Sequence, residues 1–108
     1  MIIINIARDF SDTPGARHIS DGPFSGQQFR DEILIPKYKE ACEKGEMLQV
    51  NLDGCYGFAT SFLEESFGGL VREIKEKGVE RVLEIISNDD RSLPTLIHKY
   101  IMEAEEKL

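Results

Sequence analysis

The stretch 48–67 constrains the fold more than any other part of the chain, because it joins a strand, a turn and a helix. Its first five residues, Leu-Gln-Val-Asn-Leu, are apolar or β-prone and predict a buried strand. Asp53, Gly54 and Gly57 then supply turn chemistry, and apolar residues recur at helical spacing from Leu63 onward. The pattern predicts a strand that turns sharply into a helix.

This strand-to-helix corner is the best candidate for a functional site. Thr60 and Ser61 should stand in the first turn of the helix, where backbone N–H groups lack partners and the helix dipole is positive. Such a position suits an anion, a phosphorylated side chain or a docking partner. The candidate partner-binding residues are Gly57, Phe58, Thr60, Ser61, Glu64 and Glu65.

Ser61 and the two glutamates also have structural explanations. Ser61 with Glu64 three residues later matches a capping box, which stabilises a helix start by about 1 kcal/mol. Glu64 and Glu65 resemble a carboxylate pair, but adjacent helical residues point about 100° apart and should not converge. We therefore expect no catalytic residue and no metal site.

Two adjacent glycines, Gly68 and Gly69, lie inside the expected helix. Each glycine costs a helix about 1 kcal/mol relative to alanine, so their presence needs a reason. One explanation is close packing of this helix on the sheet or on a neighbouring element. The other is a smooth patch that receives a partner helix, and the sequence leaves both open.

The rest of the pattern predicts one α/β domain with the order ββαβαβα, a small mixed four-stranded sheet packed with about three helices. Turn formers at 11–15 predict a hairpin between the first two strands, which places the N-terminal strand antiparallel at or near an edge. The later strands need helical crossovers and should be parallel. The expected strands are 2–6, 16–19, 48–53 and 81–87, and the expected helices are 25–45, 61–77 and 91–108.

The loop before the first helix is a second candidate surface. Ser25 and Gly26 enter a helix N-terminus that could bind a phosphate, with Arg17 supplying positive charge. The segment lacks the spacing of a P-loop or a dinucleotide fingerprint, and an N-cap at Ser25 is the simpler interpretation. A small-ligand or nucleotide sensor that uses the helix starts near Ser25 and Ser61 is therefore the alternative function.

Composition limits the classes of partner. The net charge of −7 argues against direct binding of nucleic acid or an anionic membrane, because a phosphate backbone needs clustered Lys and Arg. The two cysteines have no metal-type spacing, and nothing indicates a cofactor, a signal peptide or a membrane span. We expect a cytoplasmic domain that binds a protein, with homodimerisation through the helix at 61–77 or a sheet edge as a further option.

Five segments carry a family resemblance: Arg8 to Phe10, Pro14 to Arg17, Ser25 to Arg30, Val50 to Gly54 and Ser61 to Leu70. They resemble the STAS-like domain family DUF4325, which is related to the STAS domains of anti-sigma factor antagonists. The resemblance implies a regulatory or interaction module without chemistry of its own, whose partner is a histidine-kinase-like ATPase or a serine kinase. Ser61 matches the regulated serine of the antagonists, although Ala59 stands where they have Asp and Phe62 where they have Gly.

Overall fold

The computed structural model describes all 108 residues and contains a three-stranded parallel sheet. The strands are β1 (Ile2–Asn5), β2 (Leu48–Asn51) and β3 (Leu83–Ile86), and β2 lies in the middle. The predicted edge position of the N-terminal strand is confirmed. Its predicted antiparallel direction is wrong, because β1 runs parallel to β2 with Ile2 opposite Leu48.

The predicted strand at 16–19 and its hairpin are absent. Asn5 caps the short helix α1 (Ile6–Asp9) by accepting a hydrogen bond from the Arg8 N–H, so the chain leaves the sheet at once. The carbonyls of Ala16 and Arg17 accept hydrogen bonds from the N–H groups of Gly26 and Gln27, at the start of the next helix. These backbone groups serve a helix start and are not available to pair with β1, which reduces the sheet from four strands to three.

The first long helical segment runs from Gly26 to Lys44 as α2 (Gly26–Phe29), a π turn (Arg30–Leu34) and α3 (Ile35–Lys44). The predicted N-cap is confirmed, since the Ser25 hydroxyl accepts a hydrogen bond from the Gln28 N–H at 3.0 Å. Gly45 ends the segment in the left-handed conformation, at the expected end of this helix. Pro36 lies in the first turn of α3, where its missing N–H costs little, and the π turn lies directly before α3.

The second long segment comprises α4 (Thr60–Leu63), a π turn (Glu64–Gly68) and α5 (Gly69–Ile74). It ends at Lys75, which adopts the left-handed conformation two residues before the expected end of this helix at residue 77. Gly78 instead precedes a 3₁₀ turn (Val79–Arg81) that leads into β3. The last helix, α6 (Leu93–Glu106), closes the domain.

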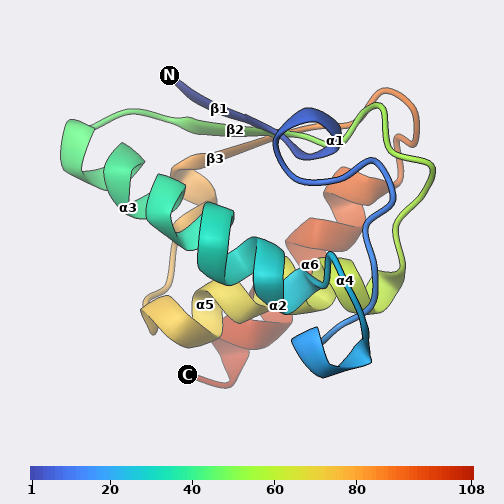
Figure 1. Ribbon diagram of the computed structural model, residues 1–108. Coiled ribbons are helices and arrows are strands. Elements are labelled where there is room, and N and C mark those ends of the chain that lie inside the picture. The colour runs from blue at the N-terminus through green and yellow to red at the C-terminus, as the bar shows by residue number, and fades with distance from the viewer.

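The sheet and the helices form two layers, with the long helices packed on one face of the sheet (Figure 1). Side chains that point toward the helices are buried, such as Ile4 and Val50, whereas Ile3 on the opposite face is 53% exposed. None of the helices has both the length and the apolar character needed to cross a membrane.

The segment 60–74 is the central helix of the domain. The predicted apolar face is confirmed, because Leu63, Phe67, Leu70 and Val71 are completely buried and Ile74 packs against the core. Within this segment the exposed residues are Thr60, Arg72 and Glu73. The helix therefore offers no broad face to a partner or a second copy, and any recognition at this segment must use its N-terminal end.

Candidate functional site

The loop that connects β2 to α4 forms an exposed corner at the carboxyl end of the middle strand. Gly57 and Thr60 are exposed, whereas Phe58 and Ser61 are half-buried. The most exposed large hydrophobic residue is Tyr56, at 87%, and its N–H donates a hydrogen bond to the Asp12 carbonyl at 2.9 Å. Sequence reasoning missed Tyr56, although an aromatic residue in a glycine-flanked turn is a visible signal.

Phe58 connects this loop to the hydrophobic core. Its ring lies 5.8 Å from the ring of Phe62, which stacks on Phe29 at 5.9 Å. Phe62 and Phe29 are both completely buried. Phe58 therefore fastens the corner to the core, which holds the backbone around Tyr56 and Thr60 in one position.

The predicted capping box at Ser61 is wrong. The helix starts one residue earlier than expected, at Thr60, and the N-cap is Ala59, whose side chain cannot accept a hydrogen bond. The Ala59 carbonyl accepts hydrogen bonds from the N–H groups of Phe62 and Leu63. The Glu64 carboxylate accepts hydrogen bonds from Arg17 and Arg72. Because no side chain caps this helix, the N–H groups of Thr60 and Ser61 have no partner within the chain and are left to water or a bound group.

Glu64 and Glu65 converge on one guanidinium group, contrary to the expectation that adjacent carboxylates point apart. The Nη1 atom of Arg17 lies 2.6 Å from Glu64 Oε1 and 3.1 Å from Glu65 Oε1. Arg72 adds two hydrogen bonds to Glu64, at 2.7 and 3.1 Å. The two acids form an ion-pair network with arginines and do not form an acid–base pair.

Arg30 completes the network in the interior. It donates a hydrogen bond to Glu65 Oε2, and both residues are at least nine-tenths buried. The second bond of Arg30, from Nε to Asp31, is 2.9 Å long. A buried charge pair of this kind depends on both partners, because either charge alone would be desolvated without compensation.

The two adjacent glycines leave room for this network. A Cβ atom at Gly69 would lie 2.8 Å from Arg30 Nη1, and one at Gly68 would overlap the Glu64 carboxylate. Of the two explanations for the glycines, close packing therefore applies, against Arg30 of the neighbouring helix at Gly69 and against side chains of the same segment at Gly68. The surface over them is occupied by arginine side chains of the same chain, so it is not a smooth patch for a partner helix.

The donors predicted to bind an anion at the Ser25 helix start already have partners within the chain. Ser25 is completely buried, and its hydroxyl already caps the helix. The N–H groups of Gly26 and Gln27 bond to carbonyls of the preceding loop, and Arg17 is held by the two glutamates. The structure thus pairs Arg17 with Glu64 and Glu65. At the Ser25 end of the helix, groups of the same chain take up the hydrogen bonds that an anion would need.

The arginines should make the stability of the domain depend on pH through Glu64. Hydrogen bonds from Arg72, opposed by partial burial and reinforced by Arg17, lower the pKa of Glu64 below its usual value of 4.5. A carboxylate whose pKa is lower in the folded than in the unfolded state stabilises the fold at pH values above its unfolded-state pKa. This stabilisation disappears as the pH falls through the folded-state pKa.

We therefore expect Glu64→Gln to lower the free energy of unfolding at neutral pH and to lose this disadvantage in acid. Urea unfolding of both proteins at several pH values from neutral to about 3 measures the difference. Glu32→Gln, at an exposed carboxylate with no ion pair, is the control and should show little difference throughout. A wild-type advantage that stays constant down to the lowest pH would contradict the role given to Glu64.

Comparison with known proteins gives one match. A family model described as a STAS-like domain of unknown function (DUF4325) matches residues 25–93, which is more than half of the chain. No curated protein and no solved structure matches. The matched region includes both long helical segments, β2, β3 and the whole corner with Tyr56 and Thr60.

Proposed function

The chain belongs to the STAS-like DUF4325 family, and we propose that it is a non-enzymatic regulatory domain that docks a protein partner through the corner at residues 57–65. In this proposal Tyr56, at the tip of the preceding loop, is the main contact residue. Glu64 and Glu65 contribute indirectly, because their ion pairs with Arg17 hold the helix start and the neighbouring loop together.

The observation that carries this proposal is the exposure of Tyr56 on a supported loop. A tyrosine that is 87% exposed leaves most of an aromatic ring in water. Tyrosine is enriched among the residues that dominate binding energy at protein interfaces. The hydrogen bond to Asp12 and the packing of Phe58 hold the loop in advance, which reduces the entropy lost on binding.

The partner class is an ATPase or a serine kinase, and this part of the proposal rests on family analogy. Phosphorylation of Thr60 or Ser61 would add a charge of roughly −2 at the positive end of the helix. Thr60 is the more accessible hydroxyl, since it is exposed and Ser61 is half-buried. The added charge would change the affinity for the partner at the same surface that Tyr56 contacts.

Site-specific crosslinking in cells tests where a partner docks. A benzophenone amino acid in place of Tyr56 should give a crosslinked adduct of defined mass on illumination. The same amino acid in place of Met102, which is 41% exposed on α6, is the control and should give little adduct. Adducts of the same protein at equal yield from both positions would contradict docking at the corner.

A further inference from the structure

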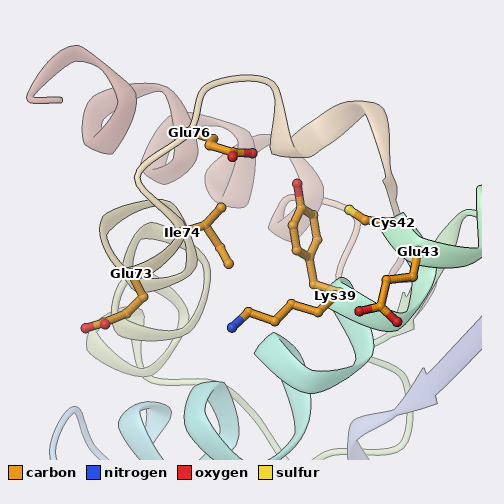
Figure 2. Close-up of a pocket in the computed structure, with 7 residues that line it drawn as sticks. Lys39, Cys42, Glu43, Glu73, Ile74 and Glu76 are labelled. Atoms are coloured by element: carbon orange, nitrogen blue, oxygen red, sulfur yellow. The ribbon is translucent and has the colours of Figure 1, made fainter.

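The groove between α3 and α5 has no unpaired buried polar group that could bind a ligand. Figure 2 shows Cys42 and Glu43 on α3 across from Ile74 on α5. The buried Tyr38 hydroxyl in this groove has the Cys42 thiol as its hydrogen-bond partner. No buried side-chain polar atom of the chain lacks a partner. The contacts that can open and close lie elsewhere, in the loop that precedes α2.

This loop, residues 14–24, forms a strap along one side of the domain and includes the 3₁₀ turn Ile19–Asp21. In Figure 1 it runs from the end of α1 past α4 to the start of α2. None of its residues is buried, whereas Ser11 before it and Ser25 after it are. A segment with so little buried surface can open at a lower free energy than unfolding of the whole domain requires.

Two sets of polar contacts hold the strap closed. The N–H groups of Gly26 and Gln27 donate hydrogen bonds to carbonyls of the strap, at 2.9 and 3.0 Å. The Arg17 guanidinium bonds to two carboxylates near the start of the segment 60–74. Its side chain is 35% exposed, so water and salt reach this ion pair. Arg17 therefore ties the strap to the central helix through a contact that solvent can replace.

Phe24 is strained in the closed strap. Its φ angle is 56°, in the left-handed region that an aromatic residue rarely adopts. Its carbonyl accepts a hydrogen bond from the Gly15 N–H at 2.7 Å, and its own N–H donates to the Gln28 side chain. Residues in this conformation persist only where surrounding contacts impose it, and they cluster in switch regions. Opening the strap breaks these contacts and relaxes Phe24, so the strain favours the open form.

The closed strap covers an aromatic cluster. The Phe24 ring packs edge to face on the Phe10 ring at 5.5 Å. Phe10 in turn lies 5.4 Å from Phe29 and 6.3 Å from Phe62, and both of these are completely buried. Phe62 also contacts Phe58 of the corner. Opening the strap therefore uncovers the outer ring of a cluster that extends to the corner.

We propose that the strap is a lid that opens as one unit while the rest of the domain stays folded. Arg17 holds it closed, the strain at Phe24 favours its release, and the open form exposes the Phe10 ring. Salt screens the ion pair of Arg17, so the open form gains population as the ionic strength rises. The opening does not depend on partner docking and can be measured on the isolated chain.

Native-state amide hydrogen exchange of the full chain, followed by two-dimensional NMR, measures this opening. The reporters are the amides of Gly15, Gly26 and Gln27, and the references are those of Leu48 and Leu52 at the middle strand. We expect the reporters to share one protection factor, about a hundredfold below that of the references. Low denaturant concentrations should reduce only the protection of the references. Equal protection of both groups, or no protection of the reporters, would overturn the proposal.

Two arginine variants separate the hold on the strap from general stability, because both arginines bond to Glu64. Arg17→Gln should speed exchange of the reporters about tenfold, since it removes a contact that only the closed strap makes. Arg72→Gln removes hydrogen bonds that persist in the open form, so exchange of the reporters should not change. Unchanged exchange in Arg17→Gln, or equal acceleration in both variants, would overturn the proposal.

A third variant holds the strap open by steric conflict. A Cβ atom at Gly15 would lie 2.3 Å from the Pro23 carbonyl oxygen, so Gly15→Ala prevents the two arms of the strap from closing. The amides of Gly26 and Gln27 should lose their protection in this variant, and the reference amides of the sheet should keep theirs. Retained protection at Gly26 and Gln27, or its loss together with that of the references, would overturn the proposal.

Discussion

Replacing Phe67 with alanine should lower the free energy of unfolding by about 3–5 kcal/mol. Phe67 is completely buried at the centre of the segment 60–74, in the π turn that packs against α6 and the first helical segment. Removing its ring deletes apolar contacts and leaves a cavity that the rigid neighbours fill only in part. Denaturant unfolding followed by circular dichroism measures the change.

The matched control for this variant is Tyr56→Ala, which removes an aromatic ring that is 87% exposed. Its effect on the free energy of unfolding should stay within about 0.5 kcal/mol, as for most surface substitutions. A small loss for Phe67→Ala, similar to that of the control, would mean that the segment 60–74 is not the central helix of the domain.

Replacing Glu65 with alanine should lower the free energy of unfolding by about 3–5 kcal/mol, because the buried guanidinium of Arg30 loses its carboxylate partner. Arg17 would lose one of its two carboxylates in the same step. The comparison variant is Glu103→Ala, which breaks an exposed ion pair with Lys99 and should cost less than about 1 kcal/mol.

A double variant distinguishes the charge effect from lost packing. Glu65→Met together with Arg30→Met removes both buried charges and should recover much of the stability lost in Glu65→Ala. If the double variant is less stable than Glu65→Ala by several kcal/mol, the loss of stability in Glu65→Ala does not come from leaving the Arg30 charge buried without its partner.

Local patterns predicted the helices and the parallel strands well. Ser25 and Gly45 mark the ends of the first long helix with cap chemistry that needs no tertiary information. The buried face from Leu63 to Val71 followed from helical spacing alone. These features depend on neighbours within a few residues, which the sequence displays directly.

The missing strand and the reversed direction of β1 required information from distant residues. The turn formers at 11–15 do produce a loop, but Ala16 and Arg17 bond to the helix start at Gly26 and Gln27. A hairpin and a cap compete for the same backbone groups, and local propensity does not decide between them. Asn5 also works against the hairpin, because it caps α1 directly after the strand.

Local sequence patterns predicted where the strand turns into the helix, but they did not predict the ion pairs at this corner. The exposed corner with Thr60 was expected, whereas the convergence of Glu64 and Glu65 on Arg17 joins residues 47 and 48 positions apart. Helical geometry alone implied that the two carboxylates diverge. Long, flexible arginine side chains bridge such a divergence, and only the fold reveals which arginines are within reach.

The most direct test of docking at the corner is a quantitative pull-down from native cell extract with the wild type, Tyr56→Ser and Ile3→Ser. Ile3 is 53% exposed on the open face of the sheet and serves as the matched control. We predict that the wild type and Ile3→Ser retain the same stoichiometric ATPase or kinase and that Tyr56→Ser loses it without unfolding. Retention of that partner by Tyr56→Ser and its loss from Ile3→Ser would place the interface on the sheet and contradict the proposal.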